Sequence, residues 1–229
     1  MGIVTNNDKH IGLTAKTEEV YEQVSLLHSI KNLYLCGGTA QSLQMGHRLS
    51  EDFDFELIGT RKERPVLDFH GIITEMKQQF SETRIEILGD NHFLAYINEC
   101  SVKLSFYRPE NSVPEINVGY SYNNIKAPSL QDLLGMKVFT TGVRSTARDY
   151  YDIYCLIEAG CKLEKAVQYA GYFSRHRQRS KDIYTRLLTP QLYPFNNDFY
   201  KLQPQYDITP DMIKERIERA IVDESSVSE

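Results

Sequence analysis

The order of hydrophobic and polar positions divides the chain into two regions with different periodicity. Short apolar stretches alternate with amphipathic segments in the first region, and three strand-like runs follow each other at residues 83–89, 92–98 and 101–107. Beyond about residue 127, apolar residues recur mostly at helical spacing. The pattern predicts an α/β (α+β) sheet domain over residues 1–127 and an all-helical C-terminal domain over residues 128–229.

The first region is expected to run helix, strand, helix, strand, helix and then an antiparallel meander of three strands. The predicted elements are a helix capped by Thr17, a strand at 33–36, a tight turn at Gly37 and Gly38, a short helix from Thr39 to about His47, a strand at 52–58, and a helix of about 15 residues with Pro65 at its first position. Residues 111–124 are expected to form a loop.

The second region is expected to contain five helices. Ser129 and Asp132 form a predicted capping box for a helix over 130–142, and Gly160 ends a second helix that starts near residue 146. Two more helices are expected over 162–173 and 180–188, and a last one opens at Pro210 after an aromatic loop.

Composition excludes several classes of protein. The chain has 229 residues with 41% hydrophobic content, which is enough for a core. It contains no run of ~20 apolar residues and no apolar leader at its start, so we expect a cytoplasmic protein that does not enter the membrane. Its four cysteines show no C-x-x-C spacing, and the net charge of −5 argues against a protein that coats nucleic acid nonspecifically.

Acidic residues alternate with phenylalanines on the strand at 52–58. Because neighbouring side chains on a strand point to opposite faces, Asp52, Asp54 and Glu56 share one face while Phe53 and Phe55 share the core face. A solvated polar face is the ordinary explanation of a single D-x-D. Acids at this density, however, repel each other and favour a hard divalent cation with oxygen ligands, such as Mg²⁺.

A glycine turn lies just before this strand and feeds a short helix. Glycines let a phosphate approach the backbone closely, and the N–H groups at a helix N-terminus attract anions. Gly37, Gly38 and Thr39 are therefore candidate phosphate-binding residues. Taken together, the turn and the acidic strand indicate a site for a nucleoside triphosphate with Mg²⁺ or Mn²⁺ bound by Asp52 and Asp54.

Two segments of the chain resemble motifs of the AbiEii/AbiGii toxin family of nucleotidyltransferases. The first is "GGTAQSLQMGHRLSEDFDF", and the second is "DLLGMKVFTTGVRSTARDYYDIYCLI". The matching residues of the first are Gly37, Gly38, Thr39, His47, Arg48, Ser50, Asp52 and Asp54, and those of the second are Lys137, Arg144, Arg148, Asp149 and Asp152. The resemblance implies a polymerase-β-like minimal nucleotidyltransferase fold followed by a helical C-terminal region.

The resemblance also implies an activity. The protein would transfer NMP from an NTP to an RNA (tRNA) or protein acceptor, as the toxin of a bacterial toxin–antitoxin or phage abortive-infection system with a cognate antitoxin. Asp52 and Asp54 would bind the metal, and Lys137 would contact the triphosphate. The late acids Asp149 and Asp152 would complete the catalytic set, and Arg48 and Ser50 are further candidates for phosphate binding.

Several of these residues also have ordinary structural explanations. Lys137 fits an exposed helix face, and Arg148 and Asp152 fit an intrahelical ion pair. If the helix continues past Gly142 or is only kinked there, then Lys137, Arg144, Arg148 and Asp152 lie on one side. A basic run at 175–181 beside aromatic residues could follow an RNA backbone or be a solvated helix end.

The sequence departs from the family pattern on the strand at 101–107. The resemblance implies a third carboxylate there, but the residue in that place is Ser105. Either Glu56 or Glu86 supplies the acid, or two acids suffice, or the chain is a catalytically impaired nucleotide-binding module. A phosphotransferase (kinase) using the same metal site is a further alternative.

Overall fold

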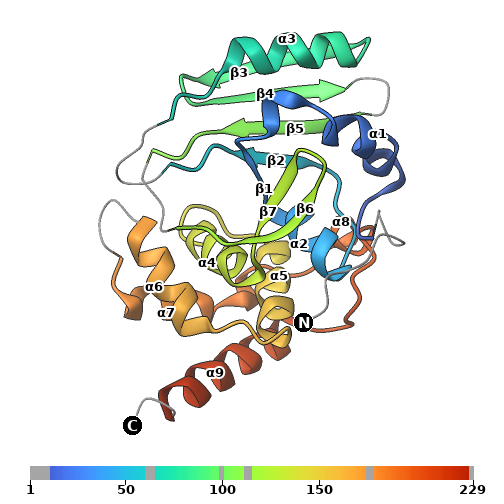
Figure 1. Cartoon of the computed structure of the whole chain (residues 1–229). Coiled ribbons are helices and arrows are strands. Elements are labelled where there is room, and N and C mark those ends of the chain that lie inside the picture. The colour runs from blue at the N-terminus through green and yellow to red at the C-terminus, as the bar shows by residue number, and fades with distance from the viewer. Residues whose placement is uncertain (1–10, 60–64, 98–100, 111–114, 174–177, 227–229) are drawn as a thin grey trace.

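The computed structural model describes residues 11–59, 65–97, 101–110, 115–173 and 178–226 (Figure 1). The strands are β1 (Tyr34–Cys36), β2 (Phe53–Glu56), β3 (Thr83–Gly89), β4 (His92–Ile97), β5 (Val102–Tyr107), β6 (Val118–Tyr122) and β7 (Ile125–Pro128). The helices are α1 (Ala15–Ser25), η1 (His28–Ile30), α2 (Gly37–Met45), α3 (Phe69–Gln79), α4 (Leu130–Thr140), α5 (Ala147–Glu158), α6 (Leu163–Phe173), α7 (Ser180–Leu187), η2 (Pro190–Leu192), α8 (Asn197–Tyr200) and α9 (Pro210–Ser226).

Five strands form one mixed sheet in the order β1-β2-β5-β4-β3. The meander β3-β4-β5 is antiparallel as expected, whereas β2 pairs with β5 in parallel and with β1 in antiparallel orientation. In Figure 1 helix α3 lies beside β3 at the top, and helices α4 to α7 and α9 gather beneath the sheet. The expected fold class, an α/β sheet region followed by helices, is confirmed.

Aromatic side chains hold the centre of the large sheet together. Phe55 of β2 stacks on Phe106 of β5 with ring centroids 5.5 Å apart, and Phe106 stacks on Phe93 of β4 at 4.8 Å. All three rings are buried, and each contributes about 1.5–3 kcal/mol of hydrophobic stabilisation. Because side chains alternate along a strand, this packing turns Asp54 and Glu56 of β2 to the opposite face.

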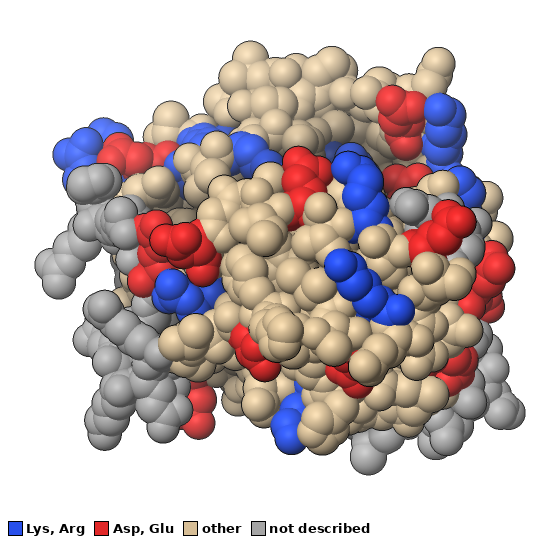
Figure 2. All heavy atoms as spheres, turned by 90° about the horizontal axis from the view of Figure 1, so that it is seen from above, with Lys and Arg blue, Asp and Glu red and all other residues tan. Residues whose placement is uncertain are grey.

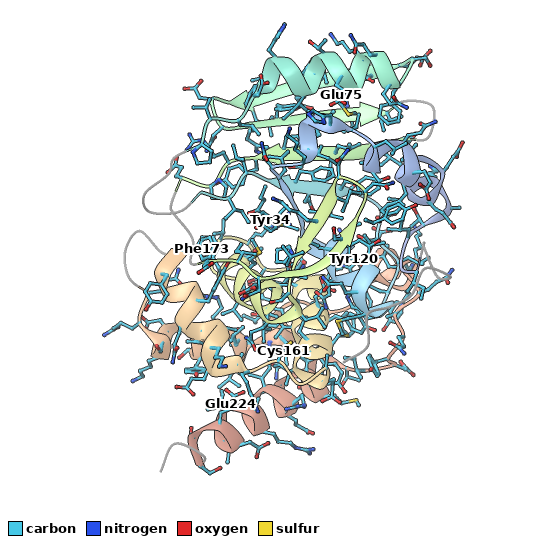
Figure 3. The ribbon with its side chains drawn as sticks, viewed as in Figure 1. Tyr34, Glu75, Tyr120, Cys161, Phe173 and Glu224 are labelled. Carbon is cyan, nitrogen blue, oxygen red and sulfur yellow. The ribbon has the colours of Figure 1, made fainter. Side chains whose placement is uncertain are left out.

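The helical region has its own hydrophobic core, built from residues of α4 to α7, α8 and α9. The sheet region has a separate core that extends into α4 through the buried Leu133, with the partly buried Met136 packed against it. Glu224 of α9, labelled in Figure 3, accepts hydrogen bonds from the backbone N–H groups of Leu163 and Glu164, and so caps the start of α6. The domain division at residue 127 stays a prediction, since α4 contributes to both cores.

Several expected boundaries were wrong in the sheet region. Thr14 rather than Thr17 caps the first helix, and Asp68 rather than Pro65 opens the third, with Gly71 N–H donating to its carboxylate. A side-chain acceptor at the N-cap satisfies free N–H groups, which the proline ring at residue 65 cannot do. The expected loop at 111–124 contains β6, which pairs with β7 in a second, two-stranded sheet.

In the helical region, the helix containing Lys137 ends at Thr140 and does not continue into the next one. The aromatic loop expected after residue 188 contains the short helices η2 and α8. Within the described residues, no helix has the length and apolar character that crossing a membrane requires.

Candidate active site

The glycine turn and the acidic strand meet at the start of α2. Strand β1 ends at Cys36, and Gly37 begins α2 with φ +68°, a conformation that favours glycine. A Cβ atom on Gly37 would lie 2.8 Å from Oδ2 of Asp54, so that any other residue type would require the Asp54 carboxylate to shift. The turn expected at Gly37 and Gly38 is therefore the first turn of the helix, and it brings backbone N–H groups and the positive helix end beside Asp54.

Side chains of α2 also hold the segment that leads into β2. The Thr39 and Ser50 hydroxyls are 2.8 Å apart, and Thr39 donates to the backbone carbonyl of Asp52. Both hydroxyl residues are buried. Gly38 packs so tightly against the Arg48 guanidinium that a Cβ atom would collide with it. These contacts fix the position of Asp52 relative to the helix N-terminus.

The carboxylates of this segment differ in environment. Asp52 lies just before β2 and is about two-fifths exposed. Its Oδ2 forms an ion pair with Nζ of Lys103 on β5, at 2.7 Å. Burial raises the pKa of Asp54, an effect that the charge on Lys103 opposes. Burial and then the charge on Asp54 raise the pKa of Glu56 to about 7. Asp54 and Glu56 are therefore largely shielded from water, whereas Asp52 is partly exposed and paired with a cation.

Asp52 and Asp54 fit the ligand chemistry of a hard divalent cation. Lys103 Nζ already stands in for a positive charge at Asp52, which indicates that this oxygen favours a cation. Within the described part of the chain, no group of three or more His, Cys, Asp or Glu side chains is arranged around one metal position. Two carboxylates nevertheless match Mg²⁺, which usually completes its octahedron with water and substrate phosphates.

A pocket of about 800 Å³ opens in front of Asp54, between the sheet and α4. Its polar part is lined by Gly37, Gly38, Asp54, Lys103, Lys137 and Arg144. Its apolar part is lined by Phe55, Leu94, Met136, Phe139 and Phe173, and Figure 3 labels Phe173 at the end of α6. A pocket lined both by cationic side chains and by apolar and aromatic groups suits an anion linked to a ring system.

Asp152 is the centre of a buried ionic network behind the pocket. The Arg48 guanidinium donates two hydrogen bonds to its carboxylate, at 2.7 and 2.9 Å, and His47 Nε2 lies 2.9 Å from Oδ1. Lys137 Nζ lies 2.6 Å from Oδ2. Burial alone would raise the pKa of Asp152, but the charges of Arg48 and Lys137 hold it well below its usual range. The carboxylate therefore favours its charged form.

Lys137 connects this network with the pocket. Its ammonium group also lies 3.2 Å from Asp149 Oδ1, and its side chain lines the pocket wall. Asp149 in turn forms a capping box with Thr146 at the start of α5. Two buried carboxylates thus fix one ammonium group, which is charged and oriented before any ligand arrives.

The structure brings most of the predicted site residues into one cluster around α2, β2, α4 and α5. The pocket is lined by Gly37, Gly38, Asp54 and Lys137, whereas Thr39, Arg48, Ser50, Asp149 and Asp152 support it from behind. The structural alternative, an intrahelical ion pair between Arg148 and Asp152, is not formed. Arg148 instead lies on the surface, 3.9 Å from the Glu51 carboxylate. The Asp152 carboxylate forms its ion pairs with Arg48 and Lys137. Arg175 and Arg177 lie outside the described residues.

Reasoning from the sequence left Lys103 unused and missed His92. Ser105 pairs in register with Asp54, and Lys103 precedes it on the same face of β5. His92 of β4 places its Nε2 3.1 Å from the Ser105 hydroxyl. Alternation along β5 indicated the face of Lys103, but nothing in the sequence indicated His92, since its position depends on how β4 pairs with β5.

The two candidates for the third acid lie in different places. Glu56 lines the pocket on the same face of β2 as Asp54. Glu86 lies on β3, at the far end of a row of paired residues across the sheet. The row runs from Glu86 through Leu94 of β4 and Ser105 of β5 to Asp54 of β2. Three strand spacings of ~4.8 Å separate Glu86 from Asp54, which is too far for both to bind one ion.

The chain is similar to a known protein family, to a curated protein and to solved structures. A family model described as "Nucleotidyl transferase AbiEii toxin, Type IV TA system" matches residues 21–224. The uncharacterized protein aq_aa25 of Aquifex aeolicus (strain VF5) is 27% identical over 145 residues, which cover 63% of this chain and 67% of that protein. The crystal structure of JHP933 from Helicobacter pylori aligns over 95% of this chain and 100% of that one, with 13% identity and a TM-score of 0.49. The chain belongs to the AbiEii nucleotidyltransferase toxin family of type IV toxin–antitoxin systems.

Proposed function

We propose that the protein transfers NMP from an NTP to a hydroxyl group of an RNA or protein acceptor, with Mg²⁺ or Mn²⁺ bound by Asp52 and Asp54. The observation that carries this proposal is the packing of the α2 N-terminus against Asp54, because it joins a phosphate site to a metal-binding carboxylate. The protein would act in the cytoplasm as the toxin of a pair whose antitoxin is a second protein.

In this proposal different residues of the pocket bind the phosphates, the metal ion and the nucleoside. Backbone N–H groups at Gly37 and Gly38 hold phosphate oxygens, and Lys137 adds a fixed positive charge on the α4 side. The bound ion would neutralise phosphate charge in the transition state. Met136, Phe139 and Phe173 offer apolar surface for the nucleoside. Asp149 and Asp152 position Lys137 rather than touching the substrate.

The acceptor is the least constrained part of the proposal. Figure 2 shows Lys and Arg interspersed with Asp and Glu on the face seen from above, without a broad basic surface there. Nonspecific coating of RNA requires such a surface. A tRNA acceptor would therefore be recognised locally, near the mouth of the pocket, where Arg144 lines the wall.

The test uses the purified chain with Mg²⁺ or Mn²⁺, each α-³²P-labelled NTP, and total cellular RNA, purified tRNA or lysate protein. We expect one NTP to label one acceptor class, and Asp54→Asn to abolish the label. Arg216→Ala is the matched control, because Arg216 binds Glu158 far from the pocket. Absence of acceptor labelling, or equal labelling by Asp54→Asn, would contradict the proposal.

A second candidate function is nucleotide binding without turnover to an external acceptor. The observation that favours it is Ser105, a neutral side chain beside Asp54 where a carboxylate base is expected. NTP-dependent thermal stabilisation without any product supports this candidate. Transfer of label from γ-³²P-NTP instead of α-³²P-NTP would identify a kinase.

A further inference from the structure

A hydroxyl group lies inside the pocket beside the metal-binding carboxylate. In one row across the sheet, Cys36 of β1 pairs with Asp54 of β2, and Asp54 pairs with Ser105 of β5. Neighbouring strands are ~4.8 Å apart, so the start of the glycine turn, Asp54 and Ser105 follow one another at single strand spacings. Ser105 also lines the pocket. A phosphate held between the glycine turn and Asp54 would therefore lie within reach of the Ser105 hydroxyl.

A histidine is placed to take a proton from this hydroxyl. His92 Nε2 lies 3.1 Å from Ser105 Oγ, and both side chains line the same pocket. The His92 ring also makes an edge contact with Tyr107, with centroids 5.4 Å apart, which orients it over β5. Burial lowers the pKa of His92, so its ring is neutral at pH 7 and able to accept a proton. A hydroxyl with a neutral imidazole at hydrogen-bond distance is the arrangement of an activated nucleophile.

We propose that Ser105 is itself an acceptor, and that the protein attaches one NMP to its own Ser105 with His92 as general base. The proposal rests on the proposed function, because it uses the same NTP and metal site. It assigns a role to the serine that stands where the family pattern implies a carboxylate. An external acceptor must diffuse into the pocket, whereas this hydroxyl is held there by the sheet, so its effective concentration is high.

The chemical step balances without any further reactant. Ser105 Oγ attacks the α-phosphorus of the NTP and forms a new P–O bond, while the bond between the α-phosphorus and the bridging oxygen breaks. Pyrophosphate carries away the bond electrons, and the proton of the hydroxyl passes to His92 Nε2. The product is a phosphodiester between Ser105 and the nucleoside. Because it fills the pocket beside Asp54, the modified chain would no longer accept a second NTP.

The test is intact-protein mass spectrometry of the full chain after incubation with Mg²⁺ or Mn²⁺ and each NTP in turn. We expect one added NMP per chain with at least one NTP, located at Ser105 by peptide mapping. Ser105→Ala should lower the modified fraction at least tenfold, and Ser105→Thr should retain it. His92→Gln should slow modification about 10²- to 10⁴-fold, the range of general-base catalysis.

The matched control is Ser121→Ala, since Ser121 is exposed on β6 and outside the pocket. Equal modification of Ser105→Ala and the unaltered chain, or modification mapped to another residue, would overturn the proposal. The experiment distinguishes failure of self-modification alone from failure of nucleotidyl transfer as a whole. If RNA or lysate protein is labelled while the chain keeps its mass, nucleotidyl transfer stands and self-modification falls. If neither is labelled, both fall.

A second variant tests the assignment of Ser105 independently, in case Ser105→Ala disturbs the structure of the pocket. Ser105→Asp places a carboxylate beside Asp54 and removes the hydroxyl. We expect it to abolish self-modification while increasing labelling of external acceptors. Retained self-modification in Ser105→Asp would contradict the assignment of Ser105. Circular dichroism and NTP-dependent thermal shifts show whether each variant is folded and binds nucleotide.

Discussion

Lys103 Nζ lies 2.7 Å from Asp52 Oδ2, so the carboxylate proposed to bind the metal already holds a cation from the neighbouring strand. Both side chains are more than a third exposed, and the pair therefore contributes only about 0–1 kcal/mol in water. Its position matters more than its strength. An ammonium group and a divalent ion at the same carboxylate repel each other, so Lys103 and the metal compete for Asp52.

The first prediction concerns this competition. Lys103→Met keeps the aliphatic stem but removes the charge, and we expect Mn²⁺ to bind about two- to fivefold more tightly in the absence of nucleotide, because the competing pair is worth up to about 1 kcal/mol. Isothermal titration calorimetry measures the change, and Lys201→Met, which removes an exposed surface pair with Asp198, is the control. Unchanged or weaker Mn²⁺ binding in Lys103→Met would mean that Lys103 does not compete with the ion.

The second prediction separates backbone strain from crowding at the metal site. Gly37 and Gly160 both have positive φ, but a Cβ atom on Gly160 meets no atom within 4 Å, whereas one on Gly37 meets Asp54. Alanine at either position should lower the free energy of unfolding by about 1 kcal/mol through strain.

Only Gly37→Ala should also weaken binding of Mn²⁺ and NTP, because it displaces the Asp54 carboxylate. Urea denaturation and calorimetry measure the two effects. Equal ligand binding by Gly37→Ala and Gly160→Ala would show that the close approach of Gly37 to Asp54 is not needed.

The third prediction concerns the buried carboxylate behind the pocket. Asp152→Asn leaves Arg48 buried without its anion, and removing one partner of a buried pair lowers stability by about 3–5 kcal/mol. Lys137 also loses one of its two carboxylates, so NTP affinity should fall. Arg148→Ala on the same helix breaks only a surface pair with Glu51 and should change stability by less than ~0.5 kcal/mol. Similar urea midpoints for the two variants would contradict a structural role of Asp152.

The fourth prediction is a pH dependence from Glu56. Burial and the Asp54 charge raise its pKa from 4.5 to about 7 in the folded protein, so the folded state holds the proton more tightly than the unfolded state. The resulting stability is fully present below pH 4.5 and is lost as the pH rises to about 7, by an amount on the order of 2–3 kcal/mol.

Glu56→Gln carries no charge and should flatten this part of the stability curve, leaving the smaller contribution of Asp54. Urea denaturation at several pH values in EDTA measures the effect. Parallel curves for the variant and the unaltered chain between pH 4.5 and 7 would contradict it.

The sequence predicted the order of most helices and strands along the chain correctly. The meander β3-β4-β5 and the order of α4, α5, α6, α7 and α9 follow from alternating and helical periods, and the glycine turn lies where it was expected, although it is the first turn of α2. Boundaries that depend on caps were less accurate. Pro65 fits a helix start by its fixed φ, but the Asp68 side chain supplies the hydrogen bond that begins α3.

By itself the sequence determined which side chains share a face. A period of two places Asp54 and Glu56 opposite Phe53 and Phe55, and a period of 3.6 places Asp149 and Asp152 near one another on α5. Only the tertiary structure decided which faces meet. Parallel pairing of β2 with β5 brings Ser105 and Lys103 beside Asp54, and α5 packs so that Asp152 binds Arg48 instead of Arg148. The physical reason is that local periodicity sets the direction of a side chain, whereas its partners depend on strand order, register and packing between distant segments.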